Sequence, residues 1–199
     1  MPSSVEVRPG LLGVPQPLYC LDINEFEPFY AQFSTGLCTK AQLKAFCNKN
    51  DCNFSLIEDS TNIEMWINDK IVGLSAISFT DFDDEDDEDS TVFVFTQDWV
   101  AIADEFRGKG IGTYMAEQCG YFAGSVAIQH MAINKVKECT FLFTADFISE
   151  GGEKYFFKMV QHLNDALDQG CRILKKKFIL EAETDSLEYE YRSKGPRRK

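Results

Sequence analysis

A short glycine-rich turn is the segment of this chain whose residue types are best suited to chemistry. It follows an apolar run that ends at Ala103, and it leads into a pattern typical of a helix. Free backbone N–H groups and the positive end of the helix dipole would meet there, and glycines let an anion approach the backbone. Two basic side chains add positive charge for the same anion. The turn therefore predicts a phosphate-binding site formed by Arg107, Gly108, Lys109, Gly110, Ile111 and Gly112.

The spacing of these glycines excludes two other phosphate-binding motifs. A P-loop requires the pattern G-x-x-x-x-G-K-[ST], which is absent here. The Rossmann fingerprint G-x-G-x-x-G requires a βαβ unit, whereas the strands expected before this turn form a meander. The turn is therefore expected to be neither a P-loop nor a Rossmann dinucleotide-binding turn.

The turn resembles the acyl-coenzyme A motif of the GNAT superfamily of N-acetyltransferases, R/Q-x-x-G-x-G/A. Arg107, Gly110 and Gly112 occupy its three defining positions. The preceding Asp104-Glu105-Phe106 looks like the acidic and aromatic lead-in of that family. The segment from Ile63 to Ala76 is similar to the family's second and third strands.

This resemblance implies an enzyme that transfers an acetyl group from acetyl-coenzyme A to a primary amine, which attacks the thioester directly. The backbone near Val100 and Ile102 would pair with the pantetheine arm, and the N–H groups of residues 108–112 would hold the pyrophosphate. The implied fold is a mixed α/β domain, in which an antiparallel meander precedes a helix, a strand, a second helix and two closing strands.

Two side chains are candidates for proton transfer. Tyr155 lies about where the family often has the acid that reprotonates the leaving thiolate, although it could equally be a core aromatic beside Phe156. Histone-type members have a glutamate as base at the position of Thr96, so this sequence departs from the pattern. Asp98 lies two residues further on the same strand face and is a candidate substitute. Glu64 or a chain of water molecules stays open as an alternative.

The acidity of the chain is concentrated in one run. The formal net charge is −12, and eight of the nine positions from Asp81 to Asp89 are acidic. Nucleic acid is disfavoured as a partner because it requires a dense basic face. The run is either a solvated loop or a surface that gathers a cationic acceptor, such as an amine-bearing small molecule or a basic peptide or protein. It also supports an alternative function, a non-catalytic protein of the same fold that binds a basic partner or mimics nucleic acid.

The cysteines and histidines form no recognisable ligand pattern. Seven cysteines include no C-x-x-C pair, and there are only two histidines. No apolar run approaches the length of a membrane span, and the N-terminus lacks the pattern of a signal peptide. We therefore expect a protein of the reducing cytoplasm without a metal or a membrane segment, and a homodimer stays open.

A single domain over residues 20–191 is expected, between an extended arm over residues 1–19 and a basic tail over residues 192–199. Four of the six prolines lie in the arm. Hydrophobic periodicity predicts the elements of the domain. These are two short helices within 24–49, strands over 63–67, 71–77 and 92–103, a helix from 112 onward that Gly120 and Gly124 kink or divide, a strand over 140–147, a helix over 153–167 that stops near Gly170, and strands over 172–180 and 187–191.

Overall fold

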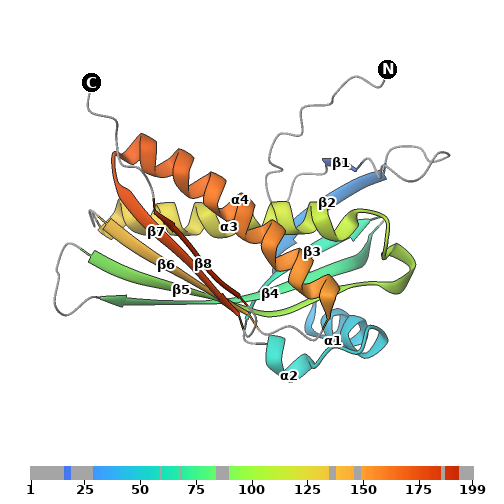
Figure 1. The fold of residues 1–199 in the computed structure, drawn as a ribbon. Coiled ribbons are helices and arrows are strands. Elements are labelled where there is room, and N and C mark those ends of the chain that lie inside the picture. The colour runs from blue at the N-terminus through green and yellow to red at the C-terminus, as the bar shows by residue number, and fades with distance from the viewer. Residues whose placement is uncertain are drawn as a thin grey trace, which may run out of the picture.

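A mixed sheet of eight strands, arranged in sequence order from β1 to β8, organises the chain (Figure 1). The computed structural model describes residues 16–18, 29–58, 60–67, 69–83, 90–134, 138–145, 149–184 and 187–192. The strands are β1 (Gln16–Leu18), β2 (Phe29–Thr35), β3 (Thr61–Ile67), β4 (Lys70–Asp83), β5 (Ser90–Ile102), β6 (Glu138–Ala145), β7 (Lys177–Thr184) and β8 (Leu187–Arg192). The helices are α1 (Lys40–Lys49), α2 (Phe54–Ile57), the 3-10 turn η1 (Asp104–Phe106), α3 (Ile111–Asn134) and α4 (Glu150–Leu174).

The strand directions confirm the expected mixed α/β class. Strands β1 to β5 pair antiparallel, β5, β6 and β7 pair parallel, and β8 returns antiparallel to β7. The parallel pairs need crossover connections, which α3 and α4 supply. The meander of β3, β4 and β5, then helix, strand, helix and two closing strands, is the order expected from the sequence.

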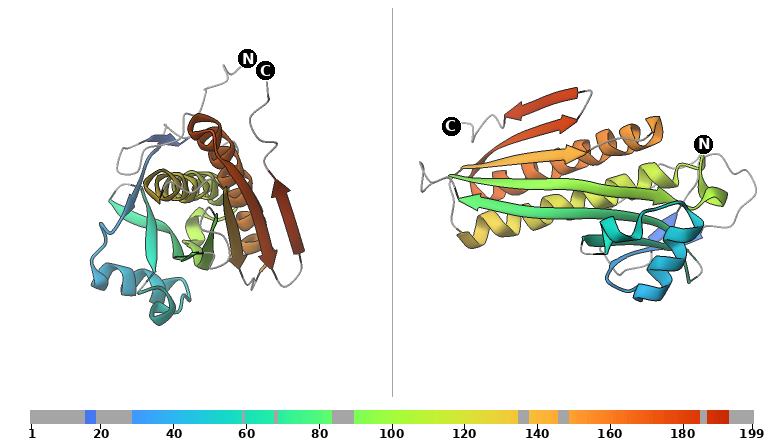
Figure 2. Two further views of the ribbon diagram at one scale, coloured as in Figure 1. Left: turned by 90° about the vertical axis from the view of Figure 1, so that its left-hand side faces the viewer. Right: turned by 90° about the horizontal axis from the view of Figure 1, so that it is seen from below.

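The sheet curves around α3 and α4, while α1 and α2 lie on its other face (Figure 2). Side chains between the sheet and the two long helices form an inner core, which includes Phe95, Phe141 and Leu163. A smaller outer core lies beneath α1 and α2 and includes Phe46 and Ile57. The sheet thus has a helical layer on both faces at the end where β5 leads into α3.

A one-residue bulge in β5 changes which face its side chains cover. Ala76 pairs with Trp99 and Ile77 pairs with Gln97, so no residue of β4 lies opposite Asp98 in the strand register. Before the bulge, odd-numbered residues such as Phe93 and Phe95 face the inner core. After the bulge the even-numbered residues Val100 and Ile102 pack against the inner core, whereas Trp99, Ala101 and Ala103 belong to the outer one. The same strand therefore serves both layers.

The first expected helix is wrong, because Phe29–Thr35 is strand β2. Ala31, Phe33 and Thr35 pair with Ile67, Met65 and Ile63 of β3. The apolar spacing in this segment fits a helix, but pairing with a distant strand decides the outcome. The expected extended arm is also revised, since Gln16–Leu18 pairs with β2 as an edge strand, a position that tolerates proline. The rest of the arm and the tail after Arg192 lie outside the described residues.

The sequence predicts that glycines end or kink the two long helices, and this prediction is wrong. These glycines instead allow the helices to pack closely. Helix α3 runs without interruption through Gly120 and Gly124, and α4 runs through Gly170 to Leu174. A Cβ at Gly124 would lie 2.5 Å from Ala166 Cβ, and one at Gly170 would lie 2.6 Å from Ile128 Cγ1. Lys175, whose φ of 58° is left-handed, caps the C-terminal end of α4. The strand expected from residue 172 therefore begins only at Lys177.

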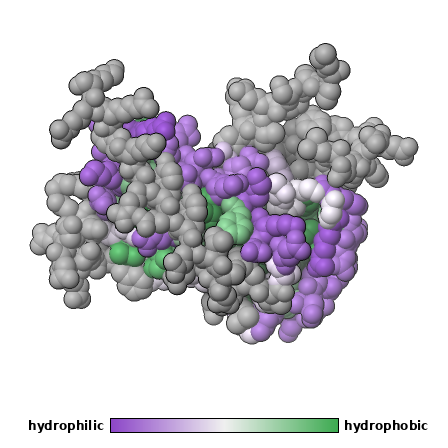
Figure 3. Space-filling model, in the orientation of Figure 1, coloured by the Kyte–Doolittle hydropathy of each residue, from purple (hydrophilic) through white to green (hydrophobic). Residues whose placement is uncertain are grey.

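The described surface on the face shown in Figure 3 is largely hydrophilic, and its hydrophobic areas are small. No helix in the described part of the chain combines the length and the apolar composition needed to cross a membrane.

Candidate functional site

The glycine-rich turn joins the end of β5 to the start of α3, as the sequence predicts. After the short η1 turn, Gly108 and Gly110 adopt φ values of 71° and 78°, which side chains with a Cβ rarely adopt. A Cβ at either position would meet no atom within 4 Å, so the space above both residues is open. Gly112 has an ordinary backbone, and a Cβ there would make only a normal contact with Ile102, at 3.9 Å. Neither packing nor backbone conformation therefore requires Gly112.

Several backbone N–H groups along this turn have no acceptor within the described structure. Arg107 N–H donates to Asp104 O at 3.2 Å, and Tyr114 N–H donates to Gly110 O at 3.2 Å. Between these two, the N–H groups of residues 108–113 donate to no other described residue. The first turn of α3 also contains no acidic residue. A row of free donors at the positive end of a long helix is a suitable site for an anion.

The two basic side chains of the turn fold back on the segment before it. Arg107 Nε donates to Ile102 O at 3.0 Å, and its guanidinium forms an exposed ion pair with Asp104 at 3.0 Å. Lys109 Nζ donates to Glu105 O at 2.6 Å. Arg107 therefore also holds the turn against the end of β5, which is a structural role.

The edge of β5 next to the turn is not covered by β6. Pairing of the two strands ends at Gln97 and Ala145, and β5 continues to Ile102. Ala103 N–H donates to Val72 O at 2.9 Å, and consecutive residues of a strand direct their peptide groups to opposite edges. The peptide groups of Val100 and Ile102 therefore point away from β4, toward the uncovered edge. The structure thus brings together the strand edge and the turn that the sequence assigned to one ligand.

Tyr155 lies in the inner core beneath this part of β5. Its hydroxyl is beside the Cys119 thiol and Ser75, and Ser75 is the partner of Val100 in the β4–β5 register. The side chain is only 6% exposed, and its hydroxyl has no hydrogen bond partner in the described structure. Burial, followed by the effect of Cys119, raises its pKa well above the usual value.

Asp98 lies on the opposite face of the sheet from Tyr155. Its carboxylate accepts hydrogen bonds from Ser60, at 2.6 Å, and from Ser78. Ser60 follows α2, so the bulge directs Asp98 to the side of α1 and α2. Thr96 shares a hydrogen bond of 3.1 Å with Thr144 and offers no basic group. The sheet therefore separates the two candidates for proton transfer.

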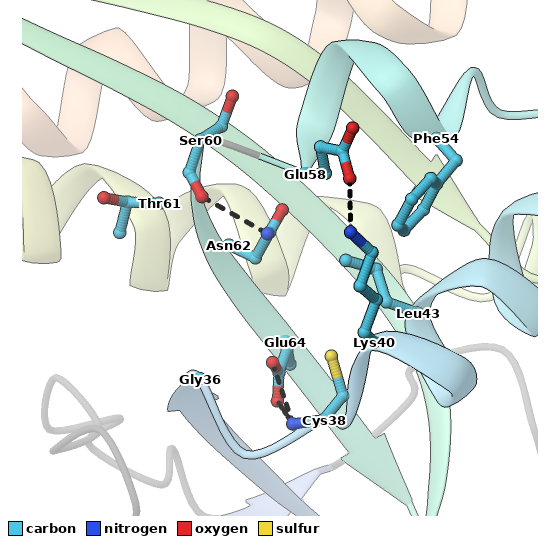
Figure 4. A pocket seen from close by; sticks show the side chains of 10 residues that line it. All are labelled: Gly36, Cys38, Lys40, Leu43, Phe54, Glu58, Ser60, Thr61, Asn62 and Glu64. Atoms are coloured by element: carbon cyan, nitrogen blue, oxygen red, sulfur yellow. Dashed lines mark hydrogen bonds and ion pairs between the residues drawn. The ribbon is translucent and has the colours of Figure 1, made fainter.

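A pocket of about 460 Å³ lies between α1, α2 and the start of β3 (Figure 4). Glu64, which the sequence suggested only as an alternative base, is among its lining residues and is fully buried. Its carboxylate accepts hydrogen bonds from Ser34, the Cys38 backbone and the Trp66 indole. Burial and Glu64 raise the pKa of the Cys38 thiol to about 12, so this thiol carries no charge at neutral pH. A lone acidic residue in the otherwise apolar stretch of β3 was the signal in the sequence.

The strands that flank the acidic run end far from the turn. Asp83 of β4 pairs with Thr91 of β5, at the end of the hairpin opposite Ile102. Ile102 lies twelve positions after Ser90 in β5, a length of about 40 Å for an extended strand. Residues 84–89 themselves lie outside the described part of the chain. The position of the flanking strand ends gives no support to the idea that the run borders the site of transfer.

No cluster of three or more metal-ligating side chains occurs within the described ranges. The candidate site is therefore built from backbone donors, two basic side chains, Tyr155 and the pocket with Glu64.

The resemblance of this chain to a solved structure is weak. No protein-family model matches the sequence, and no curated protein matches it. The chain is similar to the crystal structure of a transcriptional regulator from Bacillus halodurans C-125, with 13% identity and a TM-score of 0.37. The match covers 67% of this chain and 91% of that one. The mixed α/β class therefore rests on the element order and strand pairing described above.

Proposed function

We propose that this chain is an N-acetyltransferase of the GNAT type, which transfers an acetyl group from acetyl-coenzyme A to a primary amine. The observation that carries this proposal is the continuity between the uncovered edge of β5 and the free N–H groups of the turn. The peptide groups of Val100 and Ile102 can pair with an extended amide-containing chain. The N–H groups of residues 108–113 follow directly and can hold a pyrophosphate. Acetyl-coenzyme A has these two parts in this order.

The residues present fit this ligand in two further respects. The space above Gly108 and Gly110 is open, and nothing in the fold requires glycine at position 112. A glycine that neither packing nor the backbone demands is expected where a ligand approaches the main chain. Arg107 and Lys109 lie at the same turn, with their cationic groups near the surface.

The bound thioester would supply an activated acyl carbon, and the protein would orient the amine toward it. Tyr155, with its raised pKa, stays protonated at neutral pH and can only donate a proton. This suits an acid that protonates a leaving thiolate. Asp98 and Glu64, both on the side of α1 and α2, are the candidates for the group that takes the proton of the amine.

Thermal unfolding with and without acetyl-coenzyme A tests the cofactor part of the proposal. Ligand at about a hundred times its dissociation constant adds about 2.7 kcal/mol of stability, which raises the Tm of a chain this long by about 5–10 °C. Gly112→Asp should abolish this shift, because its carboxylate repels phosphate while an acid in the first turn suits the helix dipole. Gly151→Asp is the matched control, since Gly151 occupies the equivalent position in the first turn of α4 and is exposed. Absence of any shift in the unmodified protein would refute cofactor binding.

Release of thiol from acetyl-coenzyme A in the presence of a panel of primary amines tests the transfer reaction. Tyr155→Phe should lower kcat and leave the thermal shift by acetyl-coenzyme A intact. If the protein binds the cofactor but does not accelerate thiol release with any amine of the panel, it is a binding module and not an enzyme.

A further inference from the structure

Two cysteines meet where helix α1 ends. Asp51 adopts a left-handed φ of 55°, and Cys52 N–H donates back to Cys47 O at 2.9 Å. This combination is the Schellman arrangement, in which the side chains of the two hydrogen-bonded residues often contact each other. Both of these side chains are thiols here, and they pack in the outer core beneath α1 and α2.

The backbone holds Cys47 and Cys52 within the reach of a disulfide bond. The covalent lengths on either side of their 2.9 Å hydrogen bond limit the separation of the two Cα atoms to about 6.8 Å at most. Disulfides span Cα separations of about 4.4–6.8 Å. The two side chains also interact, since a hydrogen bond between the thiols contributes to the pKa of each. The chain fold therefore positions the pair for a bond between the two sulfur atoms.

The two thiols differ in their access to solvent. Cys47 is fully buried, whereas Cys52 is half-buried. Burial raises the pKa of the Cys47 thiol to about 11. Burial and Asp51 also raise the pKa of Cys52, but hydrogen bonds from Trp99 and Cys47 and the charge of Arg107 oppose this rise. Cys52 is thus suited to react first with a small molecule, and Cys47 to react second from within the protein.

The other described cysteines lack this arrangement. Cys119, Cys139 and Cys171 are buried in the inner core. Cys38 is half-buried like Cys52, but burial and the Glu64 carboxylate raise the pKa of its thiol to about 12. Cys38 therefore provides a thiol of similar exposure without an acidifying neighbour.

We propose that Cys47 and Cys52 form a reversible disulfide site, oxidised by a small-molecule disulfide such as glutathione disulfide. The Cys52 thiolate attacks one sulfur of the oxidant, which forms a mixed disulfide and releases one glutathione thiolate. The Cys47 thiol then loses its proton and attacks the Cys52 sulfur, so the protein disulfide forms and the second glutathione leaves. Two cysteine thiols are oxidised, one small disulfide is reduced to two thiols, and the two cysteine protons pass to these thiols. This inference does not depend on the proposed function.

Digestion with trypsin reads out the bond directly, because trypsin cleaves after Lys44, Lys49 and Lys70. Peptides 45–49 and 50–70 then carry one cysteine of the pair each, and only the disulfide joins them. The whole folded chain is incubated in mixtures of reduced and oxidised glutathione. Free thiols are then blocked with N-ethylmaleimide in denaturant before digestion and mass spectrometry. Cys47→Ser removes the internal partner of Cys52, and Cys38→Ser is the matched control.

The expected product is the linked pair of peptides 45–49 and 50–70, at least about tenfold more abundant than any link through Cys38 and reversed by dithiothreitol. Cys38→Ser should change its yield less than about twofold. Cys47→Ser should instead accumulate the mixed disulfide of Cys52 with glutathione.

Three results for the folded, unmodified protein would overturn the proposal. These are free thiols at both positions in excess glutathione disulfide, a reaction that stops at the mixed disulfide, and a link from Cys47 or Cys52 to another cysteine. If Cys47→Ser does not fold, the peptide map of the unmodified protein decides.

Discussion

Replacing Gly120 by alanine tests how closely α3 and α4 pack. The added Cβ would overlap the backbone oxygen of Met159, and it would lie 2.8 Å from His162 Cβ and 2.9 Å from Leu163 N. Uncrowded carbon contacts need roughly 3.5 Å or more. Two of the three atoms belong to the backbone of α4, so rotation of a side chain cannot relieve the overlap. The helices must separate along their contact, and the inner core must follow.

The magnitude is the difference between two opposing effects. Alanine favours a helix over glycine by about 1 kcal/mol. Overpacking of a well-filled interior costs about 1–3 kcal/mol, and the backbone contacts at Gly120 place this case at the upper end. We therefore expect Gly120→Ala to lower the free energy of unfolding by about 2 kcal/mol, despite its better helix propensity.

Denaturation by guanidinium chloride, followed by far-ultraviolet circular dichroism, measures this change. Gly151→Ala is the matched control, because a Cβ there would meet only Ser149 Oγ, at 3.8 Å. This control should be as stable as the unmodified protein or gain up to about 1 kcal/mol. A Gly120→Ala protein at least as stable as the Gly151→Ala protein would show that α3 and α4 do not touch at Gly120, and would refute the reasoning.

Three further predictions concern the bulge, a helix cap and a buried thiol. Gln97→Leu should cost about 1–3 kcal/mol and weaken acetyl-coenzyme A binding, because it removes the two hydrogen bonds that the Gln97 amide donates to the carbonyls of Ala76 and Trp99 at the bulge; chemical denaturation and the thermal shift measure the two effects, and full stability would contradict the structure. Thr39→Ala should cost about 1 kcal/mol through loss of the capping box of α1, with Thr39→Ser as the control that keeps the cap and should keep the stability. Burial raises the pKa of Cys119 from 9.0 to about 11, so the stability that its neutral thiol contributes is complete below about pH 9 and is lost as the pH rises to about 11. The loss of stability over that range should be smaller by about 2–3 kcal/mol in Cys119→Ala, and equal alkaline losses in both proteins would exclude this contribution.

Local signals in the sequence were sufficient for the hairpin and for the glycine-rich turn. Asp69, with φ of 59°, lies in the turn that the Asn68-Asp69 pair predicts between β3 and β4. The positive φ values of Gly108 and Gly110 likewise follow from residue type. Both features depend on residues that are close in sequence, so their patterns carry the information.

Features that depend on distant residues could not be predicted in the same way. The segment of β2 has apolar spacing that suits a helix, and only its pairing with β3 makes it a strand. Gly120 and Gly170 suggest helix breaks until the facing helix is known.

The same limit applies to the candidate site. Glu64 is held by groups 26 and 30 positions earlier in the chain, at Cys38 and Ser34. The shift in register that turns Asp98 toward Ser60 depends on how β5 pairs with β4. Neither arrangement leaves a local pattern in the sequence.

The bulge at Asp98 makes the number of residues in β5 as important as their identity. If the strand had no bulge, simple alternation would continue through Asp98 to the end of β5. The Trp99 indole would then turn toward α3, while Val100 and Ile102 would turn toward α2. The glycine-rich turn is attached to the end of this strand, so it would be rotated with it and its donors would face another direction. The orientation of the whole site therefore depends on one extra residue of β5, Asp98, that the pairing with β4 leaves out.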